Sequence, residues 1–369
     1  MNIYLIIQIL FFILFILEYN KVVTPQKCYN IGCFLILGLF MLRGENVGGD
    51  TLQYCYYYQG KASMYDNLDD ILTESGFPIF CKLLNIVSHN QYFFIAMISF
   101  ITLCPYLYLV RKYSNNKSMA FFLFMSIWTL MGAYMTALRQ VLSISFIIYA
   151  YILYHQKISS KIKISGCILL LTFAFLSHNS ALYAIPLFII IYLSKMKRKV
   201  ALILLFSSWM IIYITKDVFS IIYNSLEVVM SQMDLASRFL NYDSSSSYAV
   251  SQDISPWSLL PVTVLMMIFT YLSDEEELNS MPAKCMVFGT AFFNVGASFP
   301  MTFRVLMIIL IFALSYTPKS FLKKINPSLC SIIVVIMIYM IQYKYTFYTV
   351  FERAIRDGEK TIPYLFFWE

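Results

Sequence analysis

Four arginines are the residues of this chain best suited to bind an anion, because the planar guanidinium fork can grip two phosphate oxygens at once, which lysine does poorly. They are Arg43, Arg139, Arg238 and Arg304, at the ends of apolar segments or in the loops between them. Most lysines fall in the alternate set of loops, so these arginines lie on the face that normally carries few positive charges. We interpret them as ligands for a diphosphate-bearing lipid held at the membrane surface.

Three side chains are candidates to take a proton from a hydroxyl group: Asp50, Glu74 and His178. Asp50 follows Gly48 and Gly49, and paired glycines let the backbone turn tightly and approach a ligand closely. His178 lies in a short turn on the same side as the arginines. Each residue also has a structural interpretation, as part of an ion-paired turn, as a surface carboxylate or as an interface histidine. The residues alone do not choose among them.

An aromatic run follows Asp50, consisting of Tyr54, Tyr56, Tyr57 and Tyr58. Tyrosines near a membrane surface commonly anchor a protein at the lipid headgroups. They can also stack on a sugar ring, and we assign Tyr54 to the candidate substrate site on that basis. The sequence leaves both interpretations open for each ring.

The elements that position these residues are apolar segments. The chain has 369 residues, of which 60% are hydrophobic and 13% charged, whereas a soluble domain is nearer 25% charged. This predicts an all-α polytopic integral membrane protein with about twelve spans, or ten to twelve if the shortest segments do not cross. The predicted segments are 3–18, 29–42, 91–110, 118–135, 140–154, 164–177, 180–193, 200–215, 256–272, 283–299, 302–317 and 328–343.

The basic residues orient these segments. More than half of the 27 lysines and arginines fall in one alternate set of loops, which the positive-inside rule places in the cytoplasm. The acidic run at 274–277 also falls in this set, but acids weigh little in orientation. We therefore predict one integral membrane domain over 1–369, with long extracytoplasmic loops at 43–90 and 216–255. Apolar residues at helical spacing in 43–90 predict amphipathic helices on the membrane surface, interrupted at Gly76–Pro78.

Several other sites and partners are not indicated. The net charge of +7 follows from the lysine-rich loops, so we expect no nucleic acid partner. The sequence contains neither a G-x-x-x-x-G-K-[ST] phosphate loop nor G-x-G-x-x-G, and no Cys/His spacing typical of a metal site. We expect no cofactor and no metal. Among the eight cysteines, Cys55 and Cys81 share the first long loop and could form a disulfide.

An ordered set of short motifs resembles the EpsG-like branch of bacterial polysaccharide polymerases, which includes Wzy-type O-antigen polymerases. The resemblance runs from Arg43 to Pro318, and one departure is Gly49, where the family tends to place threonine or another small residue. The motifs are Arg43, then Val47-Gly48-Gly49-Asp50-Thr51 with Tyr54, then Glu74-Ser75-Gly76-Phe77, then Arg139-Gln140, then His178-Asn179-Ser180, then Arg304.

The resemblance implies a metal-independent glycosyltransferase with a GT-C-like architecture in the bacterial cytoplasmic membrane, its active site facing the periplasm. It implies transfer of a glycan from undecaprenyl diphosphate to the sugar end of a lipid-linked repeat unit. The implied partners are undecaprenyl-diphosphate-linked oligosaccharides, membrane lipids and a chain-length regulator. The arginines would stabilise the departing diphosphate, and Asp50, Glu74 or His178 would act as base.

Three alternatives remain. An O-antigen ligase uses a similar donor with a different acceptor, so sequence discriminates poorly between the two. A lipid-linked oligosaccharide flippase would carry charges inside its helix bundle, whereas these apolar segments are almost free of charge. A membrane acyltransferase usually buries a histidine within a span, whereas His178 lies at an edge.

Overall fold

A computed structural model of the chain describes residues 3–61, 75–211, 256–296, 300–321 and 327–356. The described residues are helical almost throughout and contain no strand, which confirms the all-α prediction. Residues 198–211 are helical as well. The other helices are α1 (Ile3–Tyr19), α2 (Pro25–Met41), α3 (Thr51–Tyr58), α5 (Gly76–Val87), α6 (Gln91–Tyr113), α7 (Lys117–Ser126), α8 (Trp128–Thr136), α9 (Leu138–Tyr154), α10 (Ser160–Ser177), α11 (Ala181–Leu193), α14 (Pro256–Leu272), α15 (Glu275–Leu278), α16 (Met281–Gly296), α17 (Pro300–Leu314) and α19 (Pro327–Arg356).

Helix starts follow local chemistry that is visible in the sequence. Thr24 accepts a hydrogen bond from the Lys27 N–H, and Pro25 occupies the first helical position of α2. Asn90 and Asn116 cap α6 and α7 in the same way. These caps satisfy backbone donors that the helices cannot satisfy internally.

Every predicted apolar segment contains a helix, but one segment is broken. Residues 118–135 form α7 and α8, which meet at a bend of 70° instead of forming one straight span. By length and composition, two described helices can each cross a membrane, α6 and α10, and the bent pair is a third if it counts as one span. Shorter apolar helices make up most of the remaining bundle, so the number of spans stays a prediction.

The core of the bundle is aromatic and lies where α2, α6, α7 and α8 meet. The ring of Tyr106 stacks on Phe124 at 4.6 Å, and Phe124 in turn meets Tyr134 edge-on at 5.4 Å. Gly32 of α2 faces the ring of Phe121 so closely that a Cβ atom would lie 2.1 Å from it. Helices α2 and α7 can therefore pack closely, because position 32 has no side chain.

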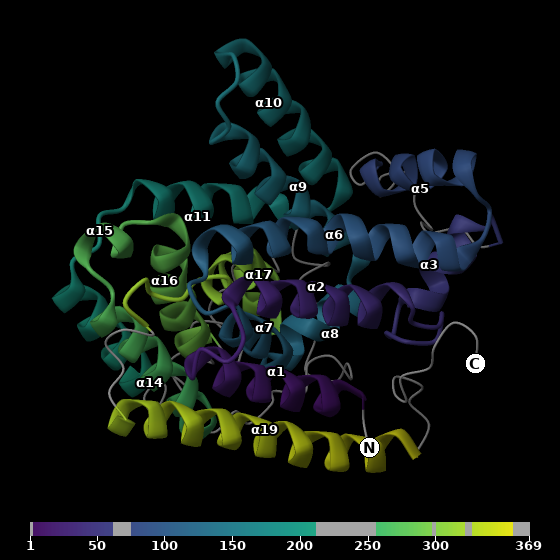
Figure 1. The fold of residues 1–369 in the computed structure, drawn as a ribbon. Helices are drawn as coiled ribbons and strands as arrows, with labels where there is room; N and C mark the ends of the chain where they lie inside the picture. The colour runs from purple at the N-terminus through teal and green to yellow at the C-terminus, as the bar shows by residue number, and fades with distance from the viewer. Residues whose placement is uncertain (1–2, 62–74, 212–255, 297–299, 322–326, 357–369) are drawn as a thin grey trace, which may run out of the picture.

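Most of the loops predicted to lie in the cytoplasm gather at one end of the bundle, which we call the basic end (Figure 1, marked by α15), whereas the turn between α9 and α10 lies at the tip of a projecting hairpin. Side chains and backbone groups from separate loops bond to one another at the basic end. The linked pairs are Glu18 with Ser118, Ser114 with Thr317, Met196 with Asn279, and Glu277 with the Lys319 N–H.

The acidic run at 274–277 has a structural role at the basic end. Asp274 accepts from the Glu277 N–H and Glu277 accepts from the Asp274 N–H, so the two residues form a capping box for the short helix α15. Glu277 also accepts the Lys319 N–H at 2.7 Å. These acids therefore hold loops together, which accounts for their presence among lysines.

Helices α3 and α5 lie at the opposite end of the bundle, which we call the site end (Figure 1). Helix α5 begins at Gly76, so the Gly76–Pro78 element starts a helix, and whether it interrupts a longer helical stretch depends on residues 62–74, which lie outside the described residues. Phe77, Cys81 and Leu84 are its buried face. Its other face exposes Ile79, Leu83, Ile86 and Val87, which suits a helix resting on lipid.

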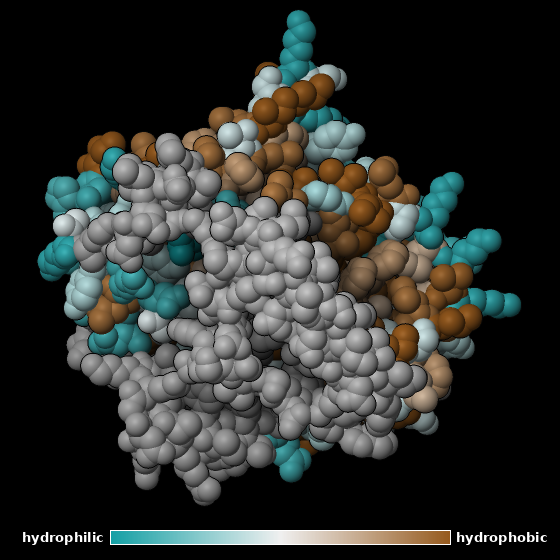
Figure 2. Space-filling model, turned by 180° about the vertical axis from the view of Figure 1, so that it is seen from behind, coloured by the Kyte–Doolittle hydropathy of each residue, from teal (hydrophilic) through white to brown (hydrophobic). Residues whose placement is uncertain are grey.

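Helices α9 and α10 form an antiparallel hairpin that projects from the bundle (Figure 1). The Ser143 hydroxyl donates to the Ala174 carbonyl at 2.7 Å, and only 11% of the apolar window of α10 is buried. In Figure 2, brown apolar residues cover much of the described surface beside this hairpin. A surface of this kind suits a hydrocarbon environment, and the chain is a membrane protein.

Cysteine labelling can test which end of the bundle faces the cytoplasm. His89 is exposed at the site end and Lys161 is exposed just after the lysine-rich turn between α9 and α10, whereas the eight native cysteines are all buried or half-buried. With an impermeant maleimide on intact spheroplasts, we expect His89→Cys to be labelled and Lys161→Cys to be labelled only after permeabilisation. The unmodified chain sets the background. The reverse pattern would place the site end in the cytoplasm.

Candidate functional site

The C-terminal end of α8 anchors the start of the first long loop. The last carbonyls of a helix have no partner within it and carry the negative end of the helix dipole. Arg43, which is 0% exposed, donates from Nη1 to the Tyr134 carbonyl at 3.2 Å. Thr51 donates from its hydroxyl to the Met135 carbonyl at 2.6 Å. Both contacts hold residues 43–51 against α8.

The contact between residues 43–51 and α8 also requires a glycine at position 48. Its φ is +99°, a backbone conformation that residues with a side chain rarely adopt. A Cβ atom there would lie 2.4 Å from the Met135 carbonyl oxygen. The motif glycine therefore serves backbone geometry and close approach to α8, and the neighbouring Asp50 is positioned as a result.

Asp50 stands immediately before α3 and is half-buried. Its side chain does not make the hydrogen bond to the first-turn N–H groups that aspartate usually makes at this position. The carboxylate therefore does not cap α3, and the role of Asp50 as base stays a prediction.

Arg139 and Tyr54 meet one turn further along α3. Arg139 is half-buried at the start of α9, and its Nε donates to the Tyr54 hydroxyl over 3.5 Å. Tyr54 is itself 6% exposed and packs on Phe77 with ring centroids 5.3 Å apart. A buried ring offers little face to a sugar, so the structure favours Tyr54 as the residue that orients Arg139 and joins α3 to α5.

Gly76, from the motif at 74–77, lies against the end of α10, just before the motif at 178–180. A Cβ atom on Gly76 would be 2.8 Å from the backbone of Leu176 and Ser177, at the end of α10. His178 follows directly as the C-cap of that helix. Gly76 thus brings α5 next to the residues that lead into His178, and α5 in turn packs on α3 through Phe77 and Tyr54.

His178 is held in one tautomer by its own turn. The Ser180 backbone N–H donates to Nδ1 at 3.0 Å, so Nδ1 must keep its lone pair. The neutral ring then carries its proton on Nε2. Such a ring can donate a hydrogen bond to an anionic oxygen from Nε2 but cannot take a proton there, which favours His178 as an anion ligand and leaves the carboxylates as better bases.

A polar network that the sequence analysis does not identify links the start of the first long loop and the end of α3 to the start of α6. Glu45 accepts from Gln91 Nε2, and Gln91 accepts from Gln59 Nε2 at 2.8 Å. The Tyr58 hydroxyl donates to the Ser88 carbonyl. Amides at scattered positions give no periodic signal, so the sequence alone does not single out Gln59 or Gln91.

The cysteines of this region are free thiols. Cys55 and Cys81 belong to one small apolar cluster with Phe77 and Leu84 and are both free, so the disulfide that their shared loop would allow is not formed. Burial raises the pKa of Cys55 to about 12, Glu45 adds to the rise and Arg43 opposes it. Burial also raises the pKa of Cys81. Both thiols stay protonated at neutral pH and serve as packing groups.

The remaining candidates stand differently in the structure. Glu74 and Arg238 lie outside the described residues. Arg304 is near the start of α17, whose far end leads to Thr317 at the basic end, so Arg304 stands on the part of α17 that is farther from the basic end. The position of its side chain is not described. Within the described ranges, no cluster of three His, Cys, Asp or Glu side chains could hold a metal ion.

The glycine contacts predict a graded set of stabilities. Gly48→Ala should lower the free energy of unfolding by at least about 1–3 kcal/mol, because it combines backbone strain with a clash. Gly60 has a φ of +70° but nothing within 4 Å of a Cβ, so Gly60→Ala should cost less. Gly38→Ala, with open space and ordinary φ, should be neutral or stabilising. Thermal unfolding in detergent measures the series, and equal losses at positions 48 and 38 would contradict it.

Comparison with known proteins agrees with the motif pattern. The model of the EpsG family matches residues 26–366, which is nearly the whole chain and includes every candidate residue described above. Neither the comparison with curated proteins nor the comparison with solved structures gave a match. Members of the matching family are similar to Wzy-type polymerases. On this match, which covers both ends of the bundle and all the motifs, the chain belongs to the EpsG family.

Proposed function

We propose that this protein is a polysaccharide polymerase that acts on undecaprenyl-diphosphate-linked glycans at the outer face of the bacterial cytoplasmic membrane. The observation that carries the proposal is the meeting of motifs at the site end. Asp50 before α3, Arg139 at the start of α9 and His178 at the end of α10 are joined through Tyr54, Phe77 and Gly76. Family membership supports a membrane glycosyltransferase-like polymerase.

The proposed reaction follows from the residue types. A hydroxyl oxygen of the acceptor sugar bonds to the anomeric carbon of the donor, while the bond from that carbon to the diphosphate oxygen breaks. Asp50 receives the hydroxyl proton, and undecaprenyl diphosphate leaves with the bonding electrons. In this proposal, Arg139 and the Nε2–H of His178 stabilise the negative charge that develops on the leaving group. The reaction as drawn needs no metal.

Arg43 has a different proposed role from Arg139. It is buried beneath the loop and bonded to a helix-end carbonyl, so it positions Gly48 and Asp50. Arg139 is half-buried at the rim and is the better candidate for direct contact with the diphosphate. Arg238, Arg304 and Glu74 remain candidates from the motif pattern alone.

An O-antigen ligase is the second candidate, because it would use the same donor and the same leaving group. A flippase is less well supported. The described charged side chains that are buried, Glu18, Arg43, Glu277 and Lys284, lie at or near helix ends or in loops, whereas a transport path needs charges deep inside the bundle. The surface glycan of a deletion strain separates polymerase from ligase, since loss of the polymerase leaves single repeat units on the acceptor and loss of the ligase leaves none.

Complementation of that deletion strain tests the base. Asp50→Asn keeps the size of the side chain but cannot accept a proton, so we expect loss of long-chain glycan by at least about a hundredfold at a normal membrane level of protein. Glu45→Gln is the matched control, because the amide keeps an oxygen for Gln91. Its polymer should be close to normal. Full polymer from Asp50→Asn would eliminate Asp50 and leave Glu74 as the next candidate.

Lysine substitutions of Arg43 and Arg139 should have different effects on activity and stability. Lysine keeps the charge but loses the bidentate fork, so Arg139→Lys should lower polymer about tenfold or more while thermal stability stays normal. Arg43→Lys should lower the thermal unfolding temperature and the membrane level of protein, because the bond to the Tyr134 carbonyl is lost in a buried place. Quantifying both glycan and protein tests this. If Arg43→Lys lost polymer at full stability, Arg43 would be a substrate ligand instead.

A further inference from the structure

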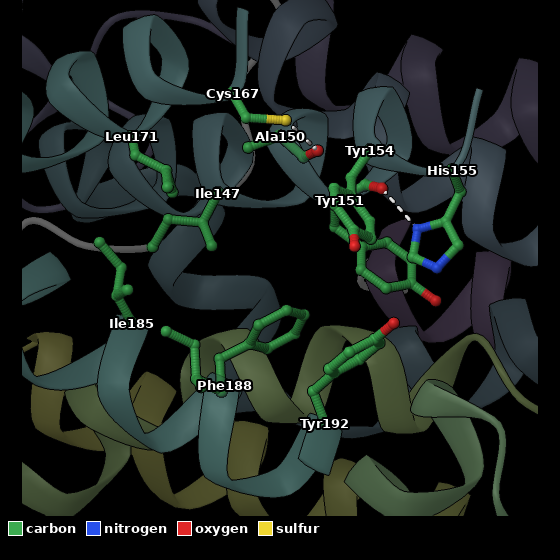
Figure 3. Close-up of a pocket in the computed structure, with 11 residues that line it drawn as sticks. Ile147, Ala150, Tyr151, Tyr154, His155, Cys167, Leu171, Ile185, Phe188 and Tyr192 are labelled. Carbon is green, nitrogen blue, oxygen red and sulfur yellow. Dashed lines mark hydrogen bonds between the residues drawn. The ribbon is translucent and has the colours of Figure 1, made fainter. Parts of the chain in front are cut away.

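An apolar cavity of about 190 Å³ lies between α9, α10 and α11, away from the candidate site (Figure 3). Nothing in the proposed reaction uses it. Its walls are aliphatic and aromatic, and a cavity of this composition suits a hydrocarbon chain. The lining residues are Ile147, Ala150, Tyr151, Tyr154, His155, Cys167, Leu171, Ile185, Phe188, Ile189 and Tyr192.

The cavity belongs to the half of the bundle near the basic end. Along α9 its lining begins at Ile147 and ends at Tyr154, whereas Arg139 stands at the opposite end of the same helix. At about 1.5 Å of rise per residue, the cavity begins about 12 Å from Arg139 and ends about 22 Å away. One leaflet is roughly 15 Å thick, so the cavity faces mainly the leaflet at the basic end.

The packing of α10 leaves the cavity open to lipid. Ala150 accepts a weak hydrogen bond from the Cys167 thiol at 3.3 Å, which fixes α10 against α9, while much of the rest of α10 is exposed. Tyr154 is 54% exposed and Ile189 is 50% exposed, although both line the cavity. A chain can therefore enter from the side, between α10 and α11.

The cavity changes character along its length. Figure 3 shows aliphatic side chains at one end and the tyrosine rings with His155 at the other. Cations flank that second end. Lys163 Nζ lies 5.7 Å from the centre of the Tyr154 ring, and Lys284 Nζ donates to the Tyr192 carbonyl at 2.7 Å.

We propose that this cavity binds one acyl chain of an anionic phospholipid, whose phosphate rests beside Lys163 and His155. The apolar end accommodates the chain, and tyrosines at the opening suit the boundary between hydrocarbon and headgroup. Basic pockets between helices at the lysine-rich side of a membrane favour anionic headgroups. A zwitterionic lipid would gain the apolar contact but not the net charge attraction. The proposal does not depend on the proposed function.

The test uses the full chain purified in detergent, with phosphatidylglycerol as the probe and phosphatidylcholine as the comparison. Native mass spectrometry counts bound lipid, and the shift in melting temperature reports affinity. We expect one phosphatidylglycerol to bind preferentially. Lys163→Ala should weaken it about fivefold, from the roughly 1 kcal/mol that one lysine contributes near anionic lipid. Lys199→Ala, which changes an exposed lysine at the start of the helix at 198–211, is the matched control and should change nothing.

A second pair of variants tests the cavity itself. Leu171→Trp fills it and should abolish the preferential binding, whereas Leu169→Trp, on the exposed face of the same helix, should not. Equal binding of the two lipids, or undiminished binding by Leu171→Trp, would overturn the proposal. So would a polyprenyl phosphate that binds in place of phosphatidylglycerol and is blocked by Leu171→Trp, because the cavity would then hold the substrate tail.

Discussion

The broken helix pair α7–α8 imposes the requirement on which the candidate site depends. In a lipid environment an unpaired backbone carbonyl costs several kcal/mol, so a helix that ends inside the protein needs donors at its end. The backbone carbonyls of Tyr134 and Met135 are at such a helix end. Arg43 donates a hydrogen bond to the first and Thr51 to the second. The site is therefore built around a helix end that the first loop must satisfy. Once that loop is fixed, the placement of Asp50, α3 and Tyr54 follows.

The two ends of the bundle use different chemistry for different tasks. At the basic end, short polar side chains and carboxylates join the loops to one another and leave most lysines at the surface. At the site end, Arg43 and Thr51 donate hydrogen bonds to backbone carbonyls. Asp50, Arg139 and His178 are half-buried there. Half-burial suits groups that must meet a ligand yet act in a medium less polar than water.

Hydropathy was sufficient to predict the helices, because an apolar run in a membrane protein has few options besides a helix. The grouping of Asp50, Arg139 and His178 at one end was also predictable, since lysine loops alternate with them. The bend at Ile127 was not, because neither proline nor glycine marks it. Burial of Arg43 and Tyr54 was not predictable either, since their partners are a backbone carbonyl and a side chain at least 85 residues away.

The bond between Arg43 and the Tyr134 carbonyl has a consequence for biogenesis. The two residues are 91 positions apart, and ribosomes add about 5–20 residues per second. The first loop must therefore wait roughly 5 to 18 s after Arg43 is made before its docking surface exists. During that interval the guanidinium of Arg43 and the tyrosines of the first loop that are buried in the folded protein are exposed to water, to lipid headgroups or to the insertion machinery. Nascent chains stalled before residue 134 would be expected to show a protease-sensitive first loop, and chains stalled beyond α10 a protected one.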